Sequence, residues 1–125
     1  MANRFFTNQA FYLEKAPVFL WAKVSVGSTG APTLSRGKGI SSVSRTGVGA
    51  YTITLQDKYP VFLNCEQTQL LASGTPAADF FKIVSETVAT DGKINIQYLN
   101  EAGAVEVGSG TVLHFTISLS NSSAV

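Results

Sequence analysis

The sequence predicts an all-β protein: an antiparallel β-sandwich, jelly-roll-like, with an extended N-terminal arm. Three observations predict this fold. Apolar and polar residues alternate over several short segments, glycine-containing turns separate these segments, and Ser and Thr make up 25 of the 125 residues. Charged residues reach only 14%, against about 25% in a typical soluble domain. We expect residues 1–13 to form the arm and residues 14–125 a single sandwich domain.

The alternation is clearest between Thr111 and Ser120, where Leu113, Phe115 and Ile117 occupy one face and polar residues occupy most of the other. This pattern is typical of an antiparallel strand with one buried and one hydrated face. Other segments with strand character are Val18–Val26, Ile40–Arg45, Ala50–Gln56, Phe80–Val88, Lys93–Leu99 and the short Ala104–Val107.

Turn residues connect these segments. The two glycines of Thr46–Gly49 predict a tight hairpin, because glycine adopts positive φ at little cost. Thr90–Lys93 contains Asp91-Gly92, a strong signal for a two-residue hairpin. Tyr59–Leu71 fits neither period, and we expect a short helical turn there, followed by a strand.

The first 13 residues carry four aromatic side chains, and Arg4 lies beside them. Phe5, Phe6, Phe11 and Tyr12 represent a large apolar surface for a chain terminus. An arm of this composition is expected to pack on its own domain or on a neighbouring molecule, by strand addition or by filling pockets. Arg4, Phe5, Phe6, Phe11 and Tyr12 are therefore the candidate interface residues.

The sequence supplies few side chains for catalysis. One histidine, His114, would have to serve every triad or metal site, and it lies on the polar row of a strand. The single cysteine, Cys65, lies in an apolar segment and is expected to be a buried thiol in a reducing compartment. There is no Gly-x-Ser-x-Gly motif, and the carboxylates are scattered. We therefore expect no enzymatic activity and no cofactor or metal ion.

Nucleic-acid and membrane binding are also not expected. The basic residues are separated along the chain, although Arg36, Lys38 and Arg45 are near enough in sequence to contact a phosphate. No apolar stretch reaches the roughly 18 residues of a membrane helix, and the N-terminus lacks the apolar core of a signal peptide. The chain is expected in the cytosol, or released from it by lysis or assembly.

One segment carries a family resemblance. The run from Gly37 to Tyr59 has the form G-I-x-S-V-x-R-x-G-x-G-x-Y-x-I-x-L-x-D, and it resembles a β-hairpin common in small virion proteins of tailed bacteriophages. The opening Arg4-Phe5-Phe6, the later Leu13-Glu14-Lys15 and the closing strand with its Asn-Ser-Ser-Ala tail are similar to such proteins too. These segments cover about a third of the 125 residues.

The resemblance implies a capsid decoration, or cement, protein that binds and stabilises the assembled shell. The implied partners are the major capsid protein and copies of the chain itself, as a dimer or trimer. The implied location is the capsid exterior, after synthesis in the host cytoplasm. No catalytic residues accompany this family.

Two alternatives remain open at this point. In the first alternative, the chain is a different virion subunit, from the tail, an adaptor or a fibre, because head and tail proteins share the hairpin. Otherwise it is a glycan-binding β-sandwich, for which Trp21, Tyr51 and Tyr98 are the candidate aromatic platforms. The alternating pattern favours core packing for Tyr51 and Tyr98.

Overall fold

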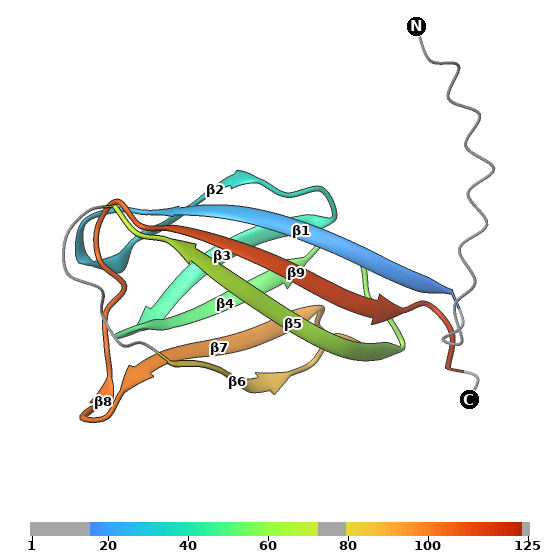
Figure 1. Ribbon diagram of the computed structural model, residues 1–125. Helices are drawn as coiled ribbons and strands as arrows, with labels where there is room; N and C mark the ends of the chain where they lie inside the picture. Colours follow the sequence, from blue (N-terminus) through green and yellow to red (C-terminus); the bar gives the residue numbers. More distant parts are fainter. Residues whose placement is uncertain (1–15, 73–79, 124–125) are drawn as a thin grey trace, which may run out of the picture.

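The computed structural model describes residues 16–72 and 80–123, and within these residues nine strands form two antiparallel sheets (Figure 1). The first sheet has the order β2-β1-β9-β5, and the second has the order β3-β4-β7-β6, with β8 paired to β7. The strands are β1 (Pro17–Val26), β2 (Pro32–Arg36), β3 (Ile40–Gly47), β4 (Ala50–Leu55), β5 (Val61–Leu70), β6 (Phe80–Glu86), β7 (Lys93–Asn100), β8 (Gly103–Ala104) and β9 (Val112–Ser120). A 3-10 turn over Ser28–Gly30 joins β1 to β2.

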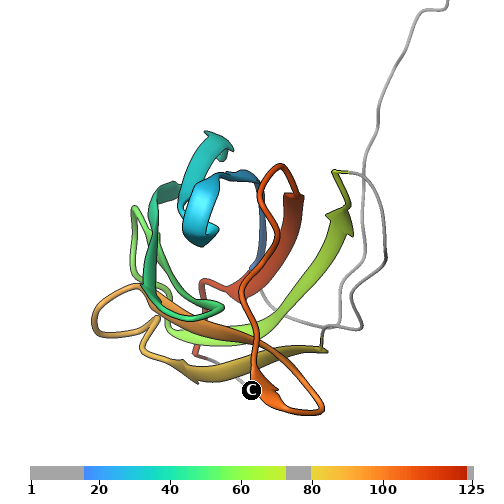
Figure 2. The same ribbon diagram turned by 90° about the vertical axis from the view of Figure 1, so that its left-hand side faces the viewer.

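The predicted all-β antiparallel sandwich is confirmed. The last strand lies beside the first, because β9 pairs with β1 on one side and with β5 on the other. The β3–β4 and β6–β7 pairs are hairpins that stay within one sheet. Viewed from the end, the two sheets wrap around a common interior (Figure 2). The predicted arm, residues 1–13, lies outside the described residues.

The core forms where the predicted apolar rows of the two sheets face each other. Leu113, Phe115 and Ile117 of β9 are buried, as are the apolar rows of β4 and β7. Each such side chain contributes about 1.5–3 kcal/mol through removal of its surface from water. The two tyrosines that were candidate platforms, Tyr51 and Tyr98, are buried and meet edge to face with ring centroids 6.0 Å apart.

Both buried tyrosines keep a hydrogen bond for their hydroxyl groups. The Tyr51 hydroxyl donates to the carbonyl oxygen of Gly30 at 2.7 Å, and the Tyr98 hydroxyl donates to Gln67 Oε1 at 3.2 Å. Burial, reinforced by the charge of Glu106, raises the pKa of Tyr51 to about 12. A buried phenol with a partner avoids the desolvation penalty of an unpaired polar group.

The helical turn expected within Tyr59–Leu71 is wrong, since Val61–Leu70 is one continuous strand paired with β9. The register shifts between Phe62 and Asn64, which marks a β-bulge. A bulge adds one residue to a strand and moves the following side chains to the opposite face. This shift breaks the apolar period, so the alternation did not indicate the first part of the strand, whereas the strand expected after the helical turn is confirmed.

The expected two-residue hairpin at Asp91-Gly92 is also wrong. The Thr87 carbonyl oxygen accepts hydrogen bonds from the amides of Thr90, Asp91 and Gly92, and the Thr87 amide donates to Lys93. The connection is therefore a wider loop after Glu86, and Val88 within it is fully buried. Burial of this side chain supplies the physical reason for the longer loop.

The predicted β3–β4 hairpin is confirmed, with Val48 and Gly49 as its loop between the paired residues Gly47 and Ala50. Gly49 has a φ of 62°, in the left-handed region that favours glycine. A Cβ atom at Gly49 would overlap the carbonyl oxygen of Val105 and stand 2.8 Å from that of Tyr98. Both neighbours are backbone atoms, which cannot move aside as a flexible side chain can.

We predict that Gly49→Ala lowers the free energy of unfolding by clearly more than about 1 kcal/mol, because it adds a backbone clash to the strain of a positive φ. The measurement is urea unfolding followed by circular dichroism. Gly103→Ala is the matched control: Gly103 also has positive φ, but no atom lies within 4 Å of its would-be Cβ. Equal losses in the two variants would contradict the role of the Val105 contact.

Candidate functional site

The outward face of the β2-β1-β9-β5 sheet presents two rows of side chains across three strands. In one row Trp21 lies opposite Thr116, which lies opposite Glu66. In the next row Lys23, His114 and Thr68 are aligned in the same way. We call these six residues the Trp21 face: Trp21, Lys23, Glu66, Thr68, His114 and Thr116.

The alternation of β1 positions the aromatic part of this face. Leu20, Ala22 and Val24 point into the core, so Phe19 and Trp21 point outward. Trp21 is 64% exposed, and its ring stacks beside that of Phe19 with centroids 6.4 Å apart and an interplanar angle of 26°. Of the three platform candidates from the sequence, Trp21 is thus the one that lies at the surface.

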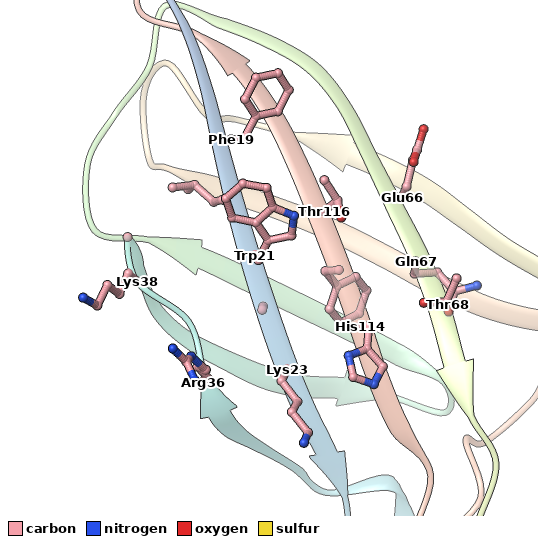
Figure 3. Close-up of a pocket in the computed structure, with 14 residues that line it drawn as sticks. Phe19, Trp21, Lys23, Arg36, Lys38, Glu66, Gln67, Thr68, His114 and Thr116 are labelled. Carbon is pink, nitrogen blue, oxygen red and sulfur yellow. The ribbon is translucent and has the colours of Figure 1, made fainter. Parts of the chain in front are cut away.

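A depression of about 710 Å³ lies over the Trp21 face, and Phe19, Arg36 and Lys38 extend its margin (Figure 3). Its volume is within the range of small-molecule binding sites. The depression exists because β2 pairs only with residues 23–26 of β1. Beside Trp21 the chain has already left the sheet, through Gly37–Gly39, to begin β3.

Positive charge gathers on one side of the depression. Lys23 and Arg36 are cross-strand partners, and Lys38 follows two residues later (Figure 3). None of these three cations forms an ion pair with a residue that the structure describes. Like charges placed opposite each other on a sheet are destabilising. The pairing of Lys23 with Arg36 therefore lowers the stability of the fold.

Negative charge lies on the other side of the depression, on β5. The Glu66 carboxylate is two strands away from Trp21 and accepts a hydrogen bond from Asn64 Nδ2 at 3.2 Å. His114 and Thr116, on β9, lie between the cations and β5, which carries Glu66 and Thr68 (Figure 3). The charges around the depression are therefore separated: the cationic side chains lie on the β1–β2 side, and the carboxylate lies on the β5 side.

Arg45 does not join Arg36 and Lys38, although their spacing in the sequence placed the three together. Its guanidinium pairs with Glu106, where Nη2 lies 2.5 Å from Oε2 and Nε lies 3.0 Å from Oε1. The Gly49 amide also donates to Glu106 Oε1, at 3.2 Å. These contacts connect the segment before β9 to the β3–β4 hairpin, so Arg45 has a structural role. The cation that lies next to Arg36 is Lys23, its partner on β1.

The outward face of the other sheet has a different character. Thr52 Oγ1 donates to Asn95 Oδ1 at 2.6 Å, and Asn95 Nδ2 donates to Ser85 at 2.9 Å. These uncharged side chains on β4, β7 and β6 satisfy one another. These three groups are therefore less available to a ligand than the side chains of the Trp21 face.

Five exposed large apolar residues lie on β5, directly after it, or on β6, and the sequence analysis did not single them out. We call them the edge surface: Leu63, Leu70, Leu71, Phe80 and Val84. β5 and β6 are the last strands of their sheets and contact each other. Both apolar segments contain a bulge, between Phe62 and Asn64 and between Ile83 and Ser85, which obscured their outward positions in the sequence pattern.

Comparison with protein-family models, with curated proteins and with solved structures finds no match to the chain. Function therefore has to be argued from the chain's own surfaces. Within the described residues, no group of three or more His, Cys, Asp or Glu side chains is placed to hold a metal ion, and no helix is long and apolar enough to cross a membrane.

The remaining candidate residues divide into three cases. His114 is exposed on the outward row, as the alternation predicted. Cys65 is a buried thiol, also as predicted, and burial raises its pKa to about 12, which keeps it protonated and unreactive at neutral pH. The arm residues Arg4, Phe5, Phe6, Phe11 and Tyr12 lie outside the described residues.

We predict that Glu106→Gln lowers the melting temperature at about pH 7 but not in strong acid. The hydrogen bond from Arg45 holds the pKa of Glu106 below its usual value, so the ion pair stabilises the fold above the unfolded-state pKa. This contribution is lost as the pH falls through the lowered folded-state pKa. Calorimetry at about pH 7 and about pH 2 measures both conditions.

The matched control is Glu101→Gln, which removes an exposed carboxylate near the same loop. This control is expected to leave the melting temperature unchanged at both pH values. A destabilisation by Glu106→Gln that persists undiminished in acid would contradict the ion-pair explanation.

Proposed function

We propose that the chain is a non-enzymatic structural protein of a tailed-phage virion, which binds the assembled capsid from outside and stabilises it. The resemblance of Gly37–Tyr59 to a virion hairpin supports this setting, and the segment spans β3 and β4. The observation that carries the proposal is the edge surface. It places large apolar side chains on two neighbouring strands that each end a sheet.

The edge surface has the features of a surface that another protein covers. Leu70 and Phe80 are 61% and 55% exposed. Soluble proteins usually protect sheet edges with charges, prolines or short strands, whereas β5 has ten residues and one charged residue, Glu66. Apolar clusters at exposed edges mark protein–protein contacts, and copies of this chain or the major capsid protein are the proposed occupants.

A decoration protein of this kind acts through binding equilibrium alone. It binds the assembled shell and not the separated subunits, so its binding free energy is added to the stability of the assembled state. Such a role needs neither cofactor nor turnover, and a dimer or trimer would repeat the contact on the symmetric shell. The proposed location is the capsid exterior, after synthesis in the host cytoplasm.

The N-terminal arm is the second proposed contact. Its residues Arg4, Phe5, Phe6, Phe11 and Tyr12 precede β1 directly in the chain. Aromatic side chains and arginine are the residue types most enriched among energetically dominant interface contacts. The arm would anchor the domain to the shell or to a sister subunit.

We predict that the protein copurifies with intact phage particles at a fixed ratio to the major capsid protein. Val84→Lys is expected to lower this ratio at least about tenfold, because it places a charge in the proposed apolar contact. Quantitative mass spectrometry of purified particles measures the ratio. Val48→Lys is the matched control, with similar exposure but a position in the β3–β4 loop, and it is expected to retain the wild-type ratio.

Three outcomes would contradict this proposal. One is the absence of the protein from purified particles. The second is equal copy numbers for the two lysine variants. The third is labelling that locates the protein on the tail by electron microscopy, which would favour a tail, adaptor or fibre subunit instead.

We predict that deletion of residues 2–12 abolishes binding to shells and leaves a folded β domain. The two sheets and their core lie within residues 16–123, so the strand spectrum in circular dichroism is expected to persist. Cosedimentation with assembled shells measures the binding. A truncated chain that binds as well as the full chain would eliminate the arm as a contact.

A further inference from the structure

The Trp21 face differs in chemical character from the edge surface, because it carries an exposed indole ring. An exposed indole ring offers a flat apolar surface to the C–H face of a sugar ring, which gains stability when both leave water. Trp21 is the single tryptophan of the chain, and it is 64% exposed next to Phe19. The core does not need this side chain, because the inward-facing residues of β1 already pack there.

The groups around Trp21 suit a ligand with many hydroxyl groups. Thr116, Thr68 and His114 line the depression and present small polar groups, and Glu66 adds a carboxylate that accepts hydrogen bonds. Apart from the two aromatic rings, the outward side chains of this depression are polar. The edge surface, by contrast, presents mainly aliphatic side chains.

The cations define the ligand further. Lys23, Arg36 and Lys38 lie together on one side of Trp21, without an ion pair to any described residue. Their mutual repulsion decreases when an anion binds between them. An acidic group on the ligand would therefore lie on the β1–β2 side of the depression, while the rest of the ligand lies over Trp21 and toward Glu66.

We propose that the Trp21 face binds a saccharide that carries an acidic group, a carboxylate or a sulfate. Single-stranded nucleic acid would also stack on Trp21, but it carries a phosphate at every unit and would bring negative charge against Glu66. The polarised face fits one acidic group at one end and hydroxyl groups at the other. On a virion surface, such a site would attach the particle to acidic glycans.

The position of Trp21 provides a direct test. Because the chain has one tryptophan, fluorescence excited at a wavelength that tyrosine does not absorb reports on this face of the full-length protein alone. Sialyllactose and lactose monosulfate serve as the carboxylated and sulfated probes, because each carries one acidic group on an otherwise neutral saccharide. We expect at least one of them to shift or quench the emission saturably, and the binding to weaken with added NaCl because exposed charges are screened. Lactose, which lacks the acidic group, is expected to bind at least about tenfold more weakly than the acidic probe that binds.

Variants separate the aromatic from the ionic contribution. Calorimetric titration is expected to show that Trp21→Ala and Arg36→Gln each lower the affinity about tenfold or more, because each removes one principal contact. Lys93→Gln is the matched control, since Lys93 is an exposed cation on the other sheet, and its affinity is expected to equal that of the wild type. Circular dichroism verifies that each variant is folded.

The absence of a saturable signal with either acidic probe would overturn the proposal. Equal affinity of the Arg36→Gln and wild-type proteins for the probe that binds would also overturn it. So would tighter binding of an oligothymidylate or a glutamate-rich peptide than of both saccharides. The last result would assign the face to nucleic acid or to an acidic protein segment. Failure here is distinguishable from failure of the shell-binding proposal, because Val84 and the Trp21 face lie on different sheets.

Discussion

The register of β9 against β1 and β5 is the constraint on which the core and the Trp21 face both depend. The inward residues of β9, such as Phe115 and Ile117, lie at the centre of the core. Its outward residues, His114 and Thr116, form the middle of the Trp21 face. Because side chains alternate with a period of two, a slip of one residue would expose the first set and bury the second. Stability and the geometry of the face are thus determined together.

The three surfaces of the sandwich differ in how fully their groups are satisfied. On the β3-β4-β7-β6 sheet, outward side chains such as Thr52 and Asn95 hydrogen-bond to one another. On the Trp21 face the cations lack described ion-pair partners, and on the edge surface apolar side chains remain in water. A bound partner would neutralise charge beside the Trp21 face and would remove apolar side chains of the edge surface from water. This difference supports separate roles for the two sides that remain unsatisfied.

The sequence pattern was most reliable where a strand is regular and least reliable where it bulges. The rows of β4, β7 and β9 were predicted correctly, because each has a buried and a hydrated face. The bulge after Phe62 disrupted the alternation of β5, so the segment was assigned in part to a helical turn and the edge surface was missed. At Asp91-Gly92, burial of Val88 outweighed the preference of the dipeptide for a tight hairpin.

The fold class, the buried rows, the burial of Cys65 and the shortage of catalytic side chains could be predicted from the amino-acid sequence, because they follow from local alternation and composition. Which strands are neighbours could not be predicted in this way and is known from the folded structure. In the folded chain Lys23 lies opposite Arg36, and Arg45 forms an ion pair with Glu106. Trp21, Thr116 and Glu66 are aligned across three strands. Such juxtapositions join residues far apart in the chain, and they depend on strand order and register, which a period of two within one strand does not encode.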